Sequence, residues 1–148
     1  MFKRIVLRGD GSAFAEQALP YAVAAAERFG AELILLRVFE PLRGVSGVPR
    51  VVIERVQERT RSLAHEYVGH AWLPVFGNRA CRCGRSPPEG YPHREIRRFS
   101  ENNQVDLIVI CTRGRAGFSR WLMGSVADRV VCGASIPVLL VRAQEKET

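Results

Sequence analysis

The stretch VDLIVICTRGRAGFSRWLMGSVADRVV, residues 105–131, decides the fold of this chain. It begins with a mostly apolar, β-branched run, which is typical of a strand buried on both faces of a parallel sheet. A loop with three glycines follows, and from Ser125 the apolar residues recur at the spacing of a helix. A buried strand that leads through a glycine-rich loop into a helix indicates an α/β fold with a ligand site at the end of the strand.

The same alternation of strand and helix runs through the rest of the chain. Ser12 is the predicted N-cap of the first helix and Gly30 its stop, and Pro20 should bend this helix because proline removes a backbone hydrogen bond. A third strand is expected in the middle of the chain, at LPVF or at NRACRC. The predicted elements are strand 4–7, helix 12–29, strand 31–39, helix 51–68, the third strand, a short helix near 94–102, strand 105–111, helix 125–134 and strand 136–142.

This order of elements predicts one α/β domain at residues 1–142, followed by a polar tail at 143–148. We expect an open, parallel, five-stranded sheet flanked by helices in a Rossmann-like arrangement of the adenine-nucleotide-hydrolase type, with strand order 3-2-1-4-5 and right-handed crossovers. All four predicted helices show apolar faces by their spacing. In the first helix this face consists of Phe14, Ala18, Tyr21, Ala22, Ala25 and Phe29. The other three helices have apolar faces as well. The residues on these faces are Val52, Val56, Leu63, Ile96, Phe99, Val126, Val130 and Val131.

Charge and composition narrow the class of protein. The 148 residues carry a formal net charge of +7, from 22 lysines and arginines against 15 acidic residues, which favours a phosphate-bearing partner. No aromatic-rich basic patch accompanies the charge, so we do not expect a nucleic acid partner. No run reaches the roughly 18 apolar residues of a membrane span, and the N-terminus lacks the features of a signal peptide. A cytoplasmic protein without membrane association is expected.

The four cysteines do not indicate a metal centre. Cys111 and Cys132 are expected to be small core residues. Cys81 and Cys83 form a C-x-C pair, but the histidines are too remote for a regular zinc spacing. We therefore expect no metal site, and a metal or redox role for the pair is only a minor alternative.

The glycine-rich loop after the fourth strand suits a phosphate group. Glycine lets the backbone approach a ligand closely, and the N-terminus of the following helix offers unpaired N–H groups and partial positive charge. Arg113, Arg115 and Arg120 add positive charge at the mouth. The simpler alternative is that the glycines only turn the chain and Ser125 only caps the helix. The loop is neither a P-loop nor a G-x-G-x-x-G fingerprint.

The segments 1–41 and 96–142 resemble the universal stress protein family, most specifically in CTRGRAGFSRWLMGSVADRVVCGASIPVLLVR. The nucleotide-binding branch of that family carries a motif of Gly, two residues, Gly, nine residues and then Gly-Ser or Gly-Thr. In this chain Gly114, Gly124 and Ser125 match the motif, whereas Cys111 stands at the first glycine position. Arg8 is a second departure, because the family usually has a small or apolar residue there.

The resemblance implies an ATP site, with Mg²⁺ as a candidate companion ion. Asp10 matches the acidic residue that lies by the adenosine, although an Asp in GDGS is also a typical turn residue. Val38 matches the valine that contacts adenine. The full set of expected ligand-binding residues is Asp10, Gly11, Ser12, Val38, Gly114, Arg115, Gly117, Gly124 and Ser125.

The expected function is a nucleotide-dependent interaction module of the stress response. No nucleophile is paired with a general base in the sequence and nothing orients a hydrolytic water, so slow ATP hydrolysis is the most we expect. The alternative is a family member without nucleotide that acts as a dimeric scaffold. In both cases the resemblance implies a homodimer through the edge strand that runs from Ile136 to Arg142. Nucleic-acid binding driven by the basic charge ranks lower.

Overall fold

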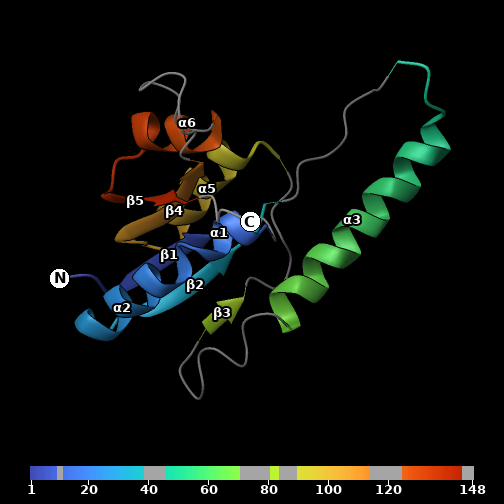
Figure 1. Ribbon diagram of the computed structural model, residues 1–148. Helices are drawn as coiled ribbons and strands as arrows, with labels where there is room; N and C mark the ends of the chain where they lie inside the picture. Colours follow the sequence, from blue (N-terminus) through green and yellow to red (C-terminus); the bar gives the residue numbers. More distant parts are fainter. Residues whose placement is uncertain (10–11, 39–45, 71–80, 84–89, 114–124, 145–148) are drawn as a thin grey trace.

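A five-stranded parallel sheet forms the centre of the molecule, in the order β3-β2-β1-β4-β5 (Figure 1). Helices cover both faces, so the predicted α/β class with a parallel sheet flanked by helices is confirmed. The strands are β1 (Arg4–Arg8), β2 (Glu32–Leu36), β3 (Cys81–Cys83), β4 (Leu107–Arg113) and β5 (Val138–Ala143). This computed structural model describes residues 1–9, 12–38, 46–70, 81–83, 90–113 and 125–144.

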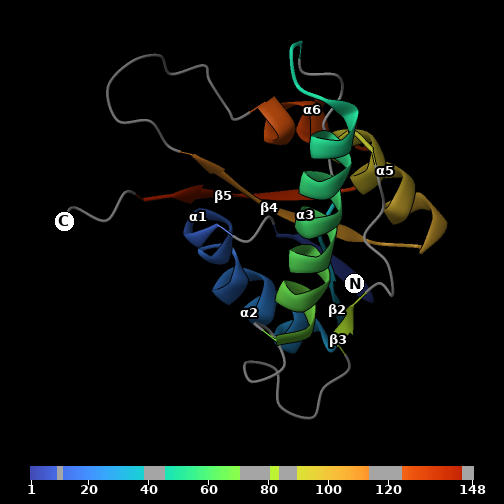
Figure 2. The same cartoon turned by 90° about the vertical axis from the view of Figure 1, so that its right-hand side faces the viewer.

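The helices divide between the two faces of the sheet. α1 (Ala13–Glu16) and α2 (Leu19–Phe29) cover one face, whereas α5 (Pro92–Asn102) and α6 (Ser125–Gly133) cover the other (Figures 1 and 2). Each face has its own apolar cluster because successive side chains of a strand point to opposite sides. In β1, Ile5 and Leu7 belong to the cluster under α2, and Val6 belongs to the cluster under α5 and α6.

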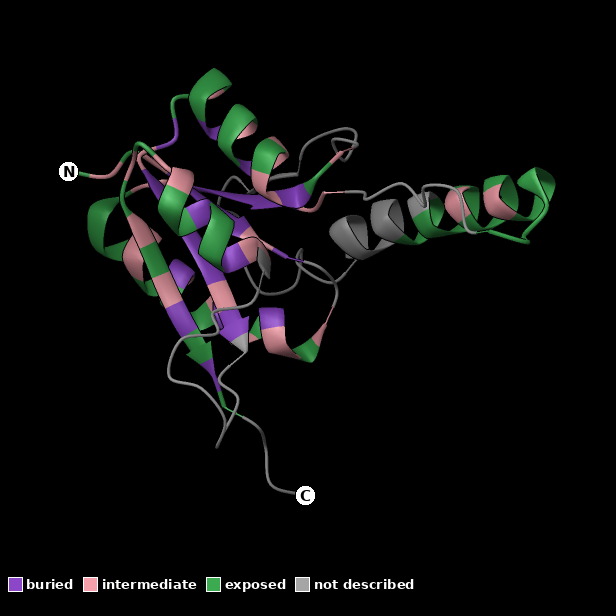
Figure 3. Ribbon diagram, turned by 90° about the horizontal axis from the view of Figure 1, so that it is seen from above, coloured by how far each residue is buried: buried purple, intermediate pink, exposed green. Residues whose placement is uncertain are grey.

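The strands of the centre are buried on both faces, as their continuous apolar runs predicted. Val6 pairs with Ile34 of β2 on one side and with Ile108 of β4 on the other. All three side chains are buried, and the buried residues concentrate on the strands in Figure 3. Burying one such side chain is worth about 1.5–3 kcal/mol. The sheet and its two apolar clusters therefore set the position of every loop at the strand ends.

The first predicted helix is divided into two. Ser12 caps α1, since its hydroxyl oxygen accepts a hydrogen bond from the Ala15 amide at 3.2 Å. The chain then turns and α2 begins, with Pro20 in its first turn, where the missing N–H of proline costs nothing. Gly30 ends α2 in the left-handed conformation, with φ of 63°. The predicted cap and stop are confirmed, but Pro20 lies at the start of a second helix and does not bend a single one. Tyr21 and Phe29 of the predicted apolar face are exposed.

The long helix α3 (Arg50–His70) lies apart from the sheet (Figures 1 and 3). The predicted helix is confirmed, but Val52, Val56 and Leu63 of its apolar side are exposed. Two predictions on α6 also need correction, because Val131 and Cys132 are exposed. Among the described side chains of that helix, Ala127 and Val130 are the buried ones. None of the described helices is long and apolar enough to cross a membrane.

The third strand, β3, lies in NRACRC, the second of the two stretches in which the sequence predicted it. β3 pairs in parallel with β2, and Leu33, Ile34 and Leu35 are its register partners. Its three residues are Cys81, Arg82 and Cys83, so the C-x-C pair is part of the sheet backbone.

Helix α5 ends in a Schellman-type turn built around Gln104. The Val105 amide donates to the Ser100 carbonyl at 2.9 Å, and Gln104 has φ of 54°, in the left-handed region. Glycine is the usual residue at this position because a side chain there crowds the backbone. The turn leads directly into β4 and brings Val105 into the core.

Asp106 joins the beginnings of β1 and β4. Its Oδ2 atom accepts hydrogen bonds from the Lys3 amide at 2.7 Å and from the Arg4 amide at 2.9 Å. These bonds from the Arg4 and Lys3 amides lower the pKa of the Asp106 carboxyl below its ordinary value. The Asp106 amide in turn donates to the Arg4 carbonyl at 2.8 Å, so the two strands begin in a fixed register.

We expect Asp106→Asn to lower the free energy of unfolding at pH 7 by about 1 kcal/mol, because hydrogen bonds to a charged acceptor near the surface are lost. The folded-state pKa of Asp106 is lowered, so its contribution is complete above the unfolded pKa near 3.9 and is lost as the pH falls through the folded value. Urea unfolding of both proteins at pH 7 and at pH 3 measures this. Glu27→Gln, on the exposed surface of α2, is the matched control. A deficit that is the same at both pH values would contradict the electrostatic origin.

We expect Gln104→Gly to raise the free energy of unfolding by about 1 kcal/mol, because glycine adopts the left-handed conformation without the steric cost of a side chain. Gly30→Ala is the mirror experiment. A Cβ atom at Gly30 would meet no other atom within 4 Å, so only the backbone conformation opposes alanine, and we expect a loss of about the same size. Equal stability of Gln104→Gly and the parent chain in thermal unfolding would refute this account of the turn.

Candidate functional site

The carboxyl ends of the parallel strands meet at one edge of the sheet, where ligands of open α/β folds bind. β1 ends at Arg8, which pairs with Leu36, the last residue of β2. The Gly9 amide extends this pairing with a 2.9 Å hydrogen bond to the Leu36 carbonyl. The expected ligand-binding residues all follow β1, β2 or β4, so chain order brings them toward this edge.

Ser12 lies at this edge as the N-cap of α1. Its hydroxyl oxygen accepts from the Ala15 amide, and α1 packs beside β4. The side chain is half-buried. Ser12 therefore has a structural role in starting α1, and that role fixes the position of its hydroxyl relative to the end of β4.

Val38 lies two residues beyond the end of β2. Its side chain is half-buried and packs against the cluster formed by Val6, Ile34 and Leu36. This arrangement gives the edge an apolar surface that continues the core. A flat apolar group, such as a purine base, is the kind of ligand that such a surface accepts.

The connection from β4 to α6 starts and ends where the sequence predicted a ligand loop. β4 ends at Arg113 and α6 begins at Ser125, with the exposed Asp128 in its first turn. The N-terminus of α6 therefore follows Gly124 directly in the sequence. The first backbone N–H groups of any helix have no intrahelical partner, which suits an anion. Six of the expected residues lie outside the described residues. They are Asp10, Gly11, Gly114, Arg115, Gly117 and Gly124.

Cys111 and Arg8, the two residues that differ from the family pattern, lie in different surroundings. Cys111 belongs to β4 itself, and its half-buried side chain packs against the cluster that contains Leu7, Val109 and Val141. The prediction that Cys111 packs against the core is confirmed. Arg8 is the last residue of β1, and its side chain is half-buried with the Nε atom fully buried.

One residue at this edge was missed by sequence reasoning. Thr112, the sixth residue of β4, is buried and polar. A signal was present, since a threonine that ends an apolar strand beside a glycine loop is a hydroxyl at the expected ligand edge. The carboxylate with a clearly lowered pKa, Asp106, lies at the opposite edge and so does not act here.

Comparisons with known proteins show which family this chain resembles. The family model described as "Universal stress protein family" matches residues 1–76 and 88–142. Both halves of the edge, after β1 and after β4, fall within the matched residues.

Individual proteins show the same similarity. A universal stress protein of Methanocaldococcus jannaschii is 31% identical to this chain, over 99% of the chain and 86% of that protein. The solved structure of universal stress protein UspA from Lactobacillus plantarum has a TM-score of 0.78 at 23% identity, covering 95% of this chain and 98% of that one. A universal stress protein solved in complex with cAMP has a TM-score of 0.61 at 22% identity, covering 97% and 98% of the two chains.

Proposed function

Since this chain belongs to the universal stress protein family, we propose that it binds an adenine nucleotide, specifically ATP, at the carboxyl edge of its sheet. The bound nucleotide sets the conformation of the edge loops, and these loops present the protein to its partners in the stress response. The observation that carries this proposal is the start of α6 at Ser125, immediately after Gly124 in the sequence, in a helix whose Ala127 packs in the same cluster as Ile110 of β4.

The start of α6 supports phosphate binding for an electrostatic reason. A helix N-terminus carries roughly half a positive charge and several N–H groups without intrahelical partners. Arg115 stands between β4 and α6 in the sequence and adds a full positive charge. A triphosphate gains more from this charge than a single phosphate does, which favours ATP. Gly114 and Gly117 leave room for the phosphates close to the backbone. Mg²⁺ bridging the phosphates is part of the proposal.

The other end of the nucleotide meets apolar and polar groups from the first half of the chain. Val38 offers the apolar surface against which adenine packs, and Asp10 accepts hydrogen bonds from the ribose. Ser12 and Gly11 complete the β1–α1 connection on that side. The neighbour solved with cAMP supports an adenine nucleotide as the ligand class, because cAMP has the same base and ribose.

The proposed role is binding rather than catalysis. Phosphoryl transfer requires a residue that positions water and groups that stabilise the developing charge. The expected residues include cationic and N–H donors for the phosphates but no base to activate a water molecule. Slow hydrolysis of bound ATP is the most that this set can support.

We expect saturable binding of a fluorescent ATP analogue, weakened about tenfold by Arg115→Gln, because one charge-assisted contact to phosphate is lost. Arg129→Gln is the matched control: it removes the same charge from the exposed surface of α6 and should leave the affinity unchanged. Fluorescence anisotropy with Mg²⁺ present measures both variants. Absence of saturation at millimolar nucleotide would sink the proposal and leave the scaffold function.

The second candidate function, a dimeric scaffold, has its own supporting observation. β5 is the edge strand next to β4, and its Leu139 side chain is 36% exposed. An apolar edge strand with unpaired backbone groups tends to pair with a second strand. We propose that two copies associate through their β5 strands, with or without nucleotide.

We expect Leu139→Lys to convert the dimer into a monomer, because a charged side chain would be buried between the β5 strands of the two copies. Leu139 is already partly exposed in the single chain, so the monomer should remain folded. Light scattering gives the mass, and circular dichroism checks the fold. Tyr21→Lys, on the exposed side of α2, should keep the mass of the parent protein. A folded Leu139→Lys dimer would contradict the proposed interface.

A further inference from the structure

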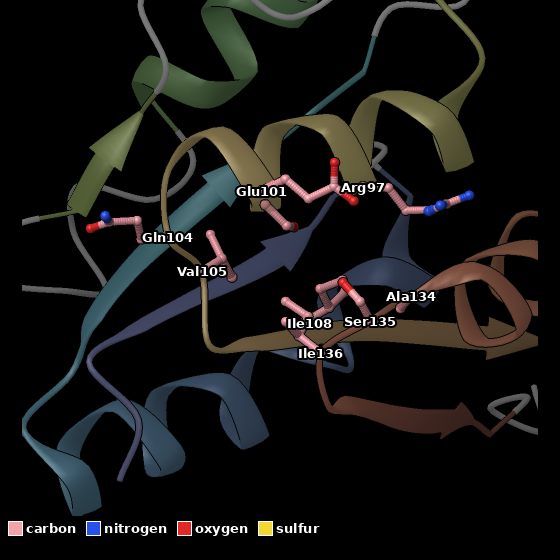
Figure 4. Close-up of a pocket in the computed structure, with 9 residues that line it drawn as sticks. Arg97, Glu101, Gln104, Val105, Ile108, Ala134, Ser135 and Ile136 are labelled. Atoms are coloured by element: carbon pink, nitrogen blue, oxygen red, sulfur yellow. The ribbon is translucent and has the colours of Figure 1, made fainter.

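A second site, unrelated to the nucleotide edge, is formed between α5 and the turn that joins α6 to β5. It is a cavity of about 220 Å³ (Figure 4). Arg97 and Glu101 lie on α5 above it, and Ile108, Ser135 and Ile136 lie below. The side chains that line it come from three parts of the chain, namely α5 with the turn after it, the beginning of β4, and the residues before β5.

The cavity lies at the opposite end of β4 from the nucleotide edge. Ile108, which lines it, is the second residue of β4, and the strand ends five residues later at Arg113. At about 3.3 Å per residue the two ends are roughly 16 Å apart. A ligand in this cavity therefore does not contact the proposed nucleotide, and the inference does not depend on the proposed function.

The floor of the cavity is apolar. Val105 is 4% exposed and Ile108 is 1% exposed, and Ile136 packs half-buried against the same cluster. These branched side chains form a surface that water wets poorly. An apolar group of a ligand would gain about 25 cal/mol for each Å² that it buries there.

The rim of the cavity carries two opposite charges. Arg97 and Glu101 lie one helical turn apart on α5 and are both exposed. Among the described residues, neither side chain has a hydrogen-bond or ion-pair partner, although this i, i+4 spacing is the one at which opposite charges normally pair. A cation and an anion therefore stand on the same rim, each without a partner in the described fold.

Gly133 lies beside the Arg97 side chain. A Cβ atom at Gly133 would lie 2.9 Å from Nη1 of Arg97, so the guanidinium rests against the backbone at the end of α6. The C-terminal end of a helix also carries partial negative charge, which favours a cation there. Arg97 is thus held at the edge of the cavity.

Two serines add polar groups. The Ser100 hydroxyl donates to the Ile96 carbonyl at 2.7 Å, so its oxygen can accept from a ligand while its proton is occupied. Ser135 is exposed and lies across the cavity from α5 (Figure 4). A ligand with a hydrogen-bond donor and an acceptor on one side and an apolar group on the other would complement both the polar rim and the apolar floor of the cavity.

We propose that this cavity binds a free apolar α-amino acid. Its carboxylate pairs with Arg97, its ammonium group pairs with Glu101, and its side chain rests on Val105, Ile108 and Ile136. The volume is below the roughly 300 Å³ at which sites for drug-sized ligands begin, which restricts the occupant to a small molecule. A simple carboxylate would leave Glu101 unpaired and be repelled by it, and a simple amine would meet Arg97 in the same way.

The ligand series tests the requirement for both charges. Isothermal titration of the full chain with L-leucine should show saturable binding. 4-Methylpentanoate lacks the amino group and 3-methylbutylamine lacks the carboxylate, and each should bind about tenfold more weakly, as expected for the loss of one charged contact. Equal binding of all three would mean that only the apolar floor recognises the ligand and would overturn the proposal. The proposal would also be overturned if none of the apolar amino acids showed saturable binding up to about 10 mM.

Variants test the two residues on the rim. Arg97→Gln and Glu101→Gln should each weaken leucine about tenfold, since each removes one charged contact and leaves the floor intact. Arg94→Gln on the exposed side of α5 and Asp128→Asn on α6 change the net charge equally outside the cavity and should bind leucine as the parent does. Binding of the ATP analogue should stay unchanged in Arg97→Gln, which separates this site from the nucleotide edge. Unaltered leucine affinity in both rim variants would refute the assignment.

Discussion

The parallel pairing of β1 with both β2 and β4 is the constraint on which the rest of the structure depends. Val6 has a hydrogen-bonded neighbour strand on each side and a helical layer above and below, so it is fully buried. The Asp106 carboxylate holds the beginnings of β1 and β4 in register. Because three adjacent strands run the same way, all of their carboxyl ends, and the loops that follow them, face one edge of the sheet.

The two ends of the sheet therefore differ in chemistry. The carboxyl end has Ser12 at the start of α1 and the half-buried Val38, whereas the amino end places Arg97 and Glu101 above an apolar floor. α6 connects the two, since it begins at the proposed phosphate loop and ends at Gly133 beside the cavity. In the two proposals, this nine-residue helix directs its positive end to the phosphates and its negative end to Arg97.

Periodicity and turn residues predicted the elements, but packing decided their limits. The cap at Ser12 and the stop at Gly30 are local signals that need only a few neighbouring residues, and both are confirmed. Val131 and Cys132 looked like core residues because apolar character alone does not fix which side of a short helix meets the sheet. The cavity gave no local signal, since Arg97 and Gly133 are 36 positions apart and meet only after α5 and α6 pack together.

The sequence by itself determined the α/β class, the alternation of strands and helices, the family and the edge of the sheet at which a ligand is expected, because these depend on hydrophobic periodicity and on short motifs. Only the tertiary structure decided that Cys132 is exposed, that α3 lies apart from the sheet, and that two opposite charges over an apolar floor have no partner among the described residues. Those features depend on which side chains approach one another across the fold. Such distances are set by the packing of helices on a sheet and not by any single stretch of the chain.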